Sequence, residues 1–376
     1  MGIPSLSEHD TIESACSVEW SIAANLLCCC TYQLDEHEEG QPQNRRGTVQ
    51  LFKTDGEGSQ LCLVPVHSEE MNNGILDSKW SSIGSSAVLG CVTSGGELTL
   101  HALKHEGEEY QLAALASGSS DDPAVLYLSL DWRDERIVVS ESKGCVSLWE
   151  VGGAGSDLQL KEQWQAHTMS GMDIEAWIAF LNPHDTSTVV SGSDDALMKI
   201  WDSRQTSAPQ HTSRVHDMGV TAGQWHPQEE HCFVTGSYDQ SIRVWDARQL
   251  ASPLAQADLG GGIWRLKWHP DMPHVLLAAC MHGGVKVVSV GLPESGGETD
   301  GADGLGSSRS SGIVELASYS RHQSMAYGAD WCQLQPLKSQ QVEPLVIASC
   351  SFYDHLLCAW EVDRSVATLA RPARPA

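Results

Sequence analysis

Short apolar runs recur along almost the whole chain, each bounded by Gly, Asp, Ser or Asn. The runs are rich in Val, Ile, Leu and Trp and alternate with polar residues, as in AVLYLSLDW (124–132) and SIRVWD (241–246). Period-two alternation between turn residues predicts short, half-buried β-strands. No apolar run approaches the length that a membrane-spanning helix needs. The pattern therefore predicts an all-β protein.

The strand pattern repeats along the chain. SGSDDALMKIWD (191–202) and TGSYDQSIRVWD (235–246) align without gaps, and SESKGCVSLWEV (140–151) is a third copy. Weaker copies begin at residues 46, 94, 282 and 352, which makes seven. A tryptophan precedes six copies, and Leu181 takes its place in the remaining one; these markers are Trp20, Trp80, Trp132, Trp225, Trp268 and Trp331. Sequence repeats that recur in this way along a chain are supersecondary units that bury their faces against one another.

These repeats predict a seven-bladed β-propeller of the WD-repeat type, with 1–376 as one domain. Each blade has four antiparallel strands, and closure of the ring leaves only short edges open. The expected blades span roughly 10–70, 71–118, 119–165, 166–213, 214–258, 259–320 and 321–365. The Gly- and Ser-rich segment 291–312 is expected to be a disordered insertion. Whether residues near Thr11 or near Val366 supply the closing strand stays open at this point.

Two adjacent blades carry the same four polar and aromatic residues at the same spacing. The sets are His167, Ser191, Asp195 and Trp201, and His216, Thr235, Asp239 and Trp245. A buried Asp in a tight turn needs hydrogen-bond donors, and an imidazole from the preceding loop supplies one. We interpret both sets as structural tetrads. Because His226 and His269 also recur, in His-Pro pairs, we interpret them as structural too.

The chain is strongly acidic, with 49 Asp and Glu against 23 Lys and Arg and a formal net charge of −26. Such a surface repels phosphate backbones and anionic lipids, so we expect neither a nucleic acid nor a membrane as partner. It attracts basic protein segments. The charge equally serves solubility alone.

Twelve cysteines are scattered over the chain, three of them consecutive at Cys28, Cys29 and Cys30. Metal-binding CxxC pairs are missing, and strand positions suit free thiols that pack as small apolar groups. We therefore expect a reducing compartment, and the N-terminal sequence has no secretory pattern. The expectation is a cytoplasmic monomer without a metal or cofactor.

One aligned position departs from the repeat. The residues four before the tryptophan markers are Cys16, Leu76, Leu128, Trp177, Thr221, Trp264 and Tyr327. This position lies near the start of the innermost strand, where blades converge around the channel mouth. The three aromatics, with Glu175, Arg265 and Asp330 nearby, predict an apolar rim with a few charged groups, which is a default binding site. The alternative is that the rings fill the channel as core.

A further candidate is His282, in the turn between the second and third strands of the sixth blade. It stands near the position of the turn Asp of other blades, and so replaces a repeat residue. A titratable side chain at such a place is a candidate acid or base, although a lone His is often structural. Known catalytic signatures are missing: there is no nucleophile elbow, no HExxH, no phosphate loop and no dinucleotide fingerprint.

Several segments go beyond the general WD pattern. They are DTIESACSVEW (10–20), LDSKW (76–80), DIEAWIAFLN (173–182), TGSYDQSIRVWDAR (235–248), GGGIWRLKWHP (260–270), VLLAACMHGGVKV (275–287) and YGADW (327–331). In these segments, in collinear order, the chain resembles the diphthine methyl esterases of diphthamide biosynthesis. The resemblance implies a cytosolic carboxylic ester hydrolase that removes the methyl ester from methylated diphthine on translation elongation factor two.

The resemblance supplies no catalytic triad, so residue roles come from chemistry. Ester hydrolysis needs a nucleophile or an activated water and a donor for the oxyanion. We predict water activated by His282 or Glu175, with Arg265 or an indole N–H of Trp177 or Trp264 stabilising the charge. Cys280 as a nucleophile is a weaker option because its strand position favours burial. Trp177, Trp264, Tyr327 and Asp330 are the predicted substrate-binding residues, and the rings suit the trimethylammonium group of the substrate.

Two other functions compete with this one. A non-enzymatic WD scaffold or adaptor would bind protein partners through the top face of the propeller, and it needs no catalytic signature. A reader of methylated or basic peptides would use the aromatic rim alone.

Overall fold

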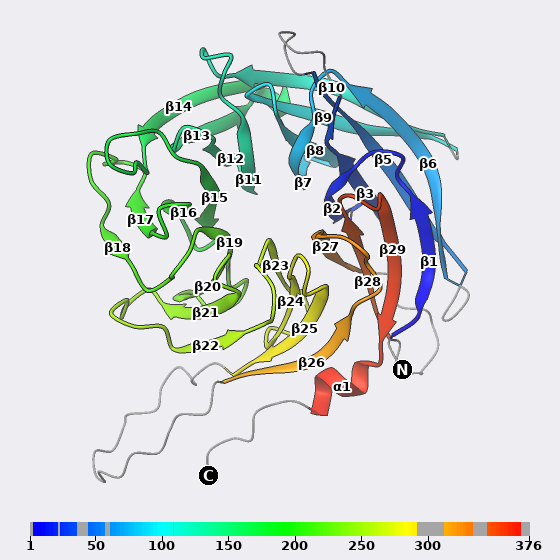
Figure 1. Cartoon of the computed structure of the whole chain (residues 1–376). Helices are drawn as coiled ribbons and strands as arrows, with labels where there is room; N and C mark the ends of the chain where they lie inside the picture. The colour runs from blue at the N-terminus through cyan, green and yellow to red at the C-terminus, as the bar shows by residue number, and fades with distance from the viewer. Residues whose placement is uncertain are drawn as a thin grey trace.

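The chain forms a ring of seven small sheets arranged radially about a central axis (Figure 1). This computed structural model describes residues 3–21, 23–35, 44–56, 61–107, 109–291, 312–333 and 344–369. The described residues form seven antiparallel sheets of four or more strands, each of which is one blade. The prediction of a seven-bladed β-propeller is confirmed.

The first three blades follow one another along the chain, each with its innermost strand first. Blade 1 contains β2 (Ala15–Ser21), β3 (Leu26–Thr31), β5 (Arg45–Asp55) and β6 (Cys62–Met71), with β4 (Gln33–Leu34) paired to β5. Blade 2 contains β7 (Ile75–Ile83), β8 (Ser86–Thr93), β9 (Glu97–Glu106) and β10 (Glu109–Ser119). Blade 3 contains β11 (Tyr127–Arg133), β12 (Arg136–Glu141), β13 (Cys145–Gly152) and β14 (Asp157–Gln165), with the 3-10 turn η2 (Gly153–Gly155) before β14.

The remaining blades keep the same order. Blade 4 contains β15 (Ala176–Asn182), β16 (Asp185–Ser193), β17 (Met198–Asp202) and β18 (His211–Ser213). Blade 5 contains β19 (Val220–Trp225), β20 (Cys232–Ser237), β21 (Ser241–Asp246) and β22 (Ala255–Asp258). Blade 6 contains β23 (Arg265–Trp268), β24 (Val275–Ala279), β25 (Val285–Val290) and β26 (Ile313–Tyr319). Blade 7 contains β27 (Ala326–Cys332), β28 (Leu345–Ser351) and β29 (Leu356–Val362).

The N-terminus closes the ring. Strand β1 (Ser5–Asp10) pairs antiparallel with β29 as the outermost strand of blade 7, and the backbone N–H of Thr11 continues the contact by donating to the carbonyl of His355 at 2.8 Å. The question that the sequence left open is therefore settled in favour of the N-terminal residues. The C-terminal helix α1 (Arg364–Leu369) follows β29 on the outside of the ring (Figure 1).

The predicted insertion at 291–312 lies outside the described residues except for its first and last positions. None of the helices in the described part of the chain is long and apolar enough to cross a membrane.

The core consists of the seams between neighbouring blades, where the marker tryptophans pack. Trp331 of β27 is 2% exposed, and its indole N–H donates to the carbonyl of Lys267 in the preceding blade at 2.9 Å. Tyr319 of blade 6 stacks on Trp360 of blade 7, with ring centroids 4.7 Å apart and planes 8° from parallel. Because each such contact joins two blades, closure of the ring stabilises all of them together.

Within the described residues, hydrogen-bonded tetrads occur in blades 4, 5 and 7. In blade 4, the His167 ring lies 3.0 Å from Asp195 and 2.8 Å from Ser191, which also accepts the indole N–H of Trp201 at 2.9 Å. Blade 5 repeats this arrangement; its members are His216, Thr235, Asp239 and Trp245. Burial lowers the pKa of both histidines.

Sequence reasoning missed the third tetrad, in blade 7. His322 lies 2.7 Å from Ser349, and Trp360 donates its indole N–H to the same hydroxyl at 3.0 Å. Ser351 stands between the His322 ring and Asp354, and bonds to both. The turn of this blade is one residue longer than in blades 4 and 5, so Asp354 does not fall at the expected spacing.

Candidate functional site

The innermost strands present two layers of side chains to the central axis. One layer, on alternate positions of β2, β7, β23 and β27, is charged; its members are Glu19, Asp77, Lys79, Arg265, Lys267 and Asp330. The other layer is formed by the residues that precede the tryptophan markers by four positions, and it contains the aromatic residues. Ladder irregularities in six of the innermost strands, including β15 and β27, fall at this position. A bulge of this kind re-aims a side chain.

Arg265 spans the channel to reach Asp77. Its guanidinium makes two contacts with the carboxylate, from Nη1 to Oδ2 at 3.0 Å and from Nη2 to Oδ1 at 2.9 Å. Asp77 is fully buried. Burial opposes its ionisation, but Arg265 and Lys79 outweigh burial and lower its pKa. Both terminal nitrogens of Arg265 are thus already engaged by a carboxylate.

Glu19 is the second anion of the charged layer. Lys267 Nζ lies 2.5 Å and Lys79 Nζ lies 2.6 Å from the same oxygen of Glu19. The two cations overcome the desolvation of Glu19 and lower its pKa. A pair of lysines from blades 2 and 6 therefore clamps one carboxylate of blade 1.

Asp330 belongs to this layer and not to the rim. Its two oxygens accept the backbone N–H groups of Trp20 and Trp331, at 2.8 and 2.9 Å, while Lys267 is 3.8 Å away. Burial raises the pKa of Asp330 to about 6, and Lys267 reduces that rise. Asp330 is three residues beyond Tyr327 along β27, which is about 10 Å in an extended strand.

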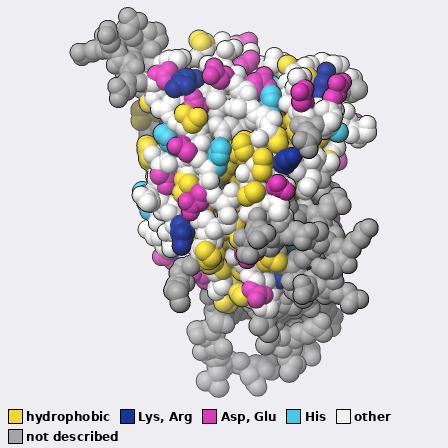
Figure 2. All heavy atoms as spheres, turned by 90° about the vertical axis from the view of Figure 1, so that its right-hand side faces the viewer, with side chains coloured by type: hydrophobic (Ala, Val, Ile, Leu, Met, Phe, Trp, Pro, Cys, Tyr) yellow, Lys and Arg dark blue, Asp and Glu magenta, His cyan; other side chains and the backbone are white. Residues whose placement is uncertain are grey.

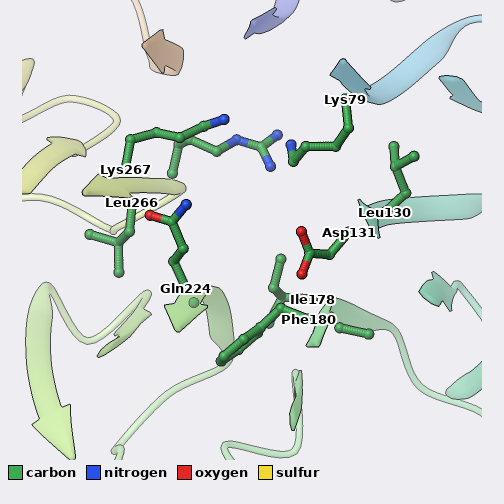
Figure 3. A pocket seen from close by; sticks show the side chains of 11 residues that line it. Lys79, Leu130, Asp131, Ile178, Phe180, Gln224, Leu266 and Lys267 are labelled. Carbon is green, nitrogen blue, oxygen red and sulfur yellow. The ribbon is translucent and has the colours of Figure 1, made fainter. Parts of the chain in front are cut away.

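A small cavity of about 30 Å³ lies beside the charged layer. Lys79 and Lys267 approach it from one side, and Asp131 and Gln224 from the other (Figure 3). This volume accommodates a single water, and the polar lining suits one. Ion pairs of the charged layer therefore cross the channel, and among the described residues the cavity beside them holds a water but not a substrate.

The aromatic residues lie together at the mouth of the channel. The Trp264 ring is the centre, with its centroid 5.5 Å from that of Trp177 and 4.8 Å from that of Tyr327. Tyr238 lies 6.1 Å from both tryptophans, and Phe352 lies 5.3 Å from Tyr327. All five are partly exposed. We call these five residues the aromatic cluster. Because the rings keep solvent contact, they differ from the fully buried ring residues of the core.

Two members of the aromatic cluster, Tyr238 and Phe352, were missed from the sequence. Both stand in the turn between the second and third strands of their blades, whereas the comparison of blades used only the innermost strand. The same turn of blade 4 holds Asp194, which accepts the indole N–H of Trp177 at 3.2 Å. An alignment of this turn across the blades would have found Tyr238, Phe352 and Asp194.

Carboxylates border the aromatic cluster. Besides Asp194, Glu175 lies directly before β15 and is partly buried. Burial raises the pKa of Tyr238, and the charges of Asp194 and Glu175 add to that rise, which places both carboxylates near its ring. Aromatic faces with carboxylates at their margin form a site for an organic cation.

His282 occupies the turn of blade 6 on the same side of the ring. Strand register aligns it with Asp239 of blade 5. Leu276 and Phe233 each pair with the marker tryptophan of their blade, and His282 and Asp239 each follow six residues later. His282 is exposed, and its neighbour Met281 pairs through the backbone with Ala326, next to Tyr327. His282 thus lies at the margin of the aromatic cluster, whereas Cys280 is fully buried with its pKa raised to about 12 by burial.

The same end of the propeller exposes apolar side chains. One kind of loop leads from the outermost strand of a blade to the innermost strand of the next blade. In antiparallel sheets, these loops lie at the same end of the propeller as the turns between the second and third strands of each blade. Among the described residues, these connections expose five large hydrophobic side chains: Ile12, Met169, Met172, Met218 and Tyr353. Ile12 has a φ of 68° and is 80% exposed. A β-branched residue in this conformation is strained, which is typical of functional surfaces.

Comparison with known proteins agrees with this architecture. A family model described as "WD domain, G-beta repeat" matches residues 164–202 and 207–246. The chain is 35% identical over 353 residues to "Diphthine methyltransferase" of Mus musculus, covering 88% of this chain and 69% of the relative. It is 32% identical over 363 residues to "Diphthine methyltransferase homolog" of Dictyostelium discoideum, covering 89% and 93%. The chain belongs to the diphthine methyltransferase family.

The Homo sapiens member of the diphthine methyltransferase family is similar too, with 35% identity over 362 residues, 89% of this chain and 76% of that protein. These matches cover most of the propeller. A solved structure titled "Crystal Structure of Mitotic Checkpoint Complex" contains a similar chain, with a TM-score of 0.66, 15% identity, and coverage of 96% and 95%. At that identity the likeness concerns the fold alone.

Proposed function

We propose that this member of the diphthine methyltransferase family is a hydrolase that removes the methyl ester from methylated diphthine on translation elongation factor two, in the cytoplasm. The observation that carries the proposal, beside the family, is the aromatic cluster with its carboxylate margin. Diphthine carries a trimethylammonium group, and aromatic faces bind quaternary ammonium ions. The cluster binds this group, and the ester beside it lies at the cluster's margin.

The reaction is a hydrolysis in which water adds to the ester carbonyl and methanol leaves, so that a carboxylate remains. Glu175 or His282 removes the proton from the attacking water and returns it to the departing methoxide. The developing oxyanion needs a donor. Arg265 is held by Asp77, and the indole N–H of Trp177 by Asp194. We therefore assign the oxyanion contact to the indole N–H of Trp264.

Surface chemistry supports a protein substrate. Asp and Glu side chains outnumber Lys and Arg on the face in Figure 2, in keeping with the net charge of −26. An acidic surface accelerates the approach of a basic protein segment. The exposed hydrophobic side chains around the cluster then provide the short-range contact, as aromatic and Met residues do in other interfaces.

The decisive experiment incubates the purified chain with elongation factor two that carries methylated diphthine. We expect the factor to lose the mass of one methylene group, measured on the modified peptide. No loss, beside an active control enzyme, contradicts the proposal and favours a non-enzymatic scaffold. Where hydrolysis occurs, Glu175→Gln and His282→Ala are compared, and near wild-type turnover in both contradicts the assigned bases while leaving the function intact.

A further inference from the structure

Blade 3 contains a pocket of about 420 Å³ that is separate from the channel. Its walls come from the end of β10, the loop that follows it, the turn between β12 and β13, and strand β14. The volume falls within the range of ordinary ligand sites. All the pocket's described neighbours belong to blades 2 and 3, apart from Asp173 in the loop toward blade 4.

The pocket occupies the place where other blades hold a tetrad. Blade 3 keeps the tryptophan, Trp149, which pairs with Ile137 as Trp201 pairs with Val189 in blade 4. By this register Val139 stands in place of the Ser191 hydroxyl, and Lys143 in place of Asp195. The preceding loop, residues 120–126, has no histidine. In blade 3 this place is bordered by the buried Tyr127 ring and by Trp149, which donates its indole N–H to Ser147 at 3.2 Å, and the pocket lies against these two rings.

The pocket is strongly negative. The described lining residues carry four carboxylates and one ammonium group, which are those of Asp121, Asp122, Glu141, Asp173 and Lys143. The ammonium of Lys143 already pairs with Asp122 at 2.5 Å. The charge of Lys143 also acts on Asp173, so the described lining holds four carboxylates against a single cation.

Glu141 is the innermost of these carboxylates and is only 1% exposed. The amide of Gln163 donates to both of its oxygens, at 2.8 and 3.0 Å, but it brings no charge. Burial raises the pKa of Glu141. Burial together with the charges of Glu141 and Asp173 also raises the pKa of the neighbouring Cys145 thiol to about 11. A buried carboxylate without a countercharge costs free energy, and a bound cation offsets that cost.

We propose that the blade-3 pocket binds an arginine side chain of a protein partner, independently of the proposed function. The half-exposed Leu160 at its margin and the Trp149 wall receive the aliphatic stem. The guanidinium group is then contacted from different sides by the carboxylates of Glu141, Asp121 and Asp173. A guanidinium offers several donors in one plane and suits such a set better than an ammonium does.

The test uses acetylated, amidated peptides of sequence Ala-Gly-Arg-Gly-Ala, with citrulline or lysine replacing the arginine in matched peptides. The full chain, labelled with ¹⁵N, is titrated while the indole N–H of Trp149 and the side-chain amide of Gln163 are followed by NMR. We expect saturable shifts with the arginine peptide and none with the citrulline peptide. Equal binding of the citrulline peptide overturns the proposal, and equal binding of the lysine peptide overturns the choice of arginine.

Variants separate the pocket from general surface charge. We expect Glu141→Gln to weaken binding at least tenfold. The double variant Asp121→Asn with Asp173→Asn is expected to weaken binding to the same extent, and because both residues are exposed, it does so without risk to the fold. Asp157→Asn, which removes an exposed carboxylate of the same blade outside the pocket, is the control and leaves the dissociation constant unchanged. Unchanged binding in the double variant overturns the site, while hydrolysis of the methyl ester is measured separately and is unaffected either way.

Discussion

Arg265 of blade 6 and Asp77 of blade 2 are joined across the channel by two contacts of 2.9 and 3.0 Å, and Asp77 has no exposed surface. The pair connects blades that are not neighbours in the ring. It therefore acts as a brace for the whole propeller. This is a different role from the oxyanion donor that the sequence suggested for Arg265.

Removal of Arg265 leaves Asp77 buried without its main partner. We expect Arg265→Ala to lower the free energy of unfolding by about 3–5 kcal/mol, the range for breaking a buried pair on one side. Urea denaturation followed by tryptophan fluorescence measures this. Arg204→Ala, which breaks an exposed pair with Asp202, is the matched control and leaves the transition unchanged. A transition for Arg265→Ala that coincides with the control would contradict the bracing role.

The tetrad of blade 7 makes stability depend on pH. Burial lowers the pKa of His322 to about 4, whereas an unfolded His titrates near 6.5. Between these values the unfolded state binds more protons, so stability is complete above about pH 6.5 and falls as the pH falls toward 4. In the wild type this linkage lowers the free energy of unfolding by about 2 kcal/mol between about pH 7.5 and about pH 5, and we expect His322→Gln to abolish that decrease.

The measurement compares urea denaturation at the two pH values for the wild type and His322→Gln. The variant is less stable at the higher pH, because Ser349 and Ser351 lose the imidazole to which both are bonded, but its stability changes less with pH. His231→Gln, on an exposed histidine, is the control and keeps the wild-type difference. Equal pH dependence in His322→Gln and wild type would rule out the linkage.

Closure by β1 is a third testable feature. Deletion of residues 1–10 exposes the edge of β29 and removes the bonds that join both ends of the ring. We expect a lower midpoint of thermal unfolding and a tendency to associate through the open edge, measured by calorimetry and light scattering. A deletion variant that stays monomeric with the wild-type midpoint would show that β1 is dispensable.

The repeat made the propeller predictable, because Ser191 and Trp201 recur with the same spacing as Thr235 and Trp245. The third tetrad escaped because one extra residue in its turn displaces Asp354 from that spacing. Arg265 and Asp77 could not be paired from sequence, since their contact depends on how far apart blades 6 and 2 stand across the channel. Asp330 was assigned to the rim because it follows Tyr327 by three residues, yet along an extended strand that separation places it in another layer.

The aromatic cluster gives the sharpest test of the proposed substrate site. Trp264 contacts Trp177, Tyr238 and Tyr327, so Trp264→Ala removes both the central ring and the proposed oxyanion donor. We expect KM for the methylated elongation factor to rise at least tenfold and kcat to fall by about 10²-fold, the cost of losing one such donor. Trp264→Phe keeps a ring face without an N–H group, and is therefore expected to restore most of KM but not kcat. Tetramethylammonium ions should inhibit the wild type competitively, because they occupy the place of the trimethylammonium group. Inhibition that is equal in the wild type and in Trp264→Ala, or a Phe variant with full kcat, would contradict the assignment of Trp264 to both roles.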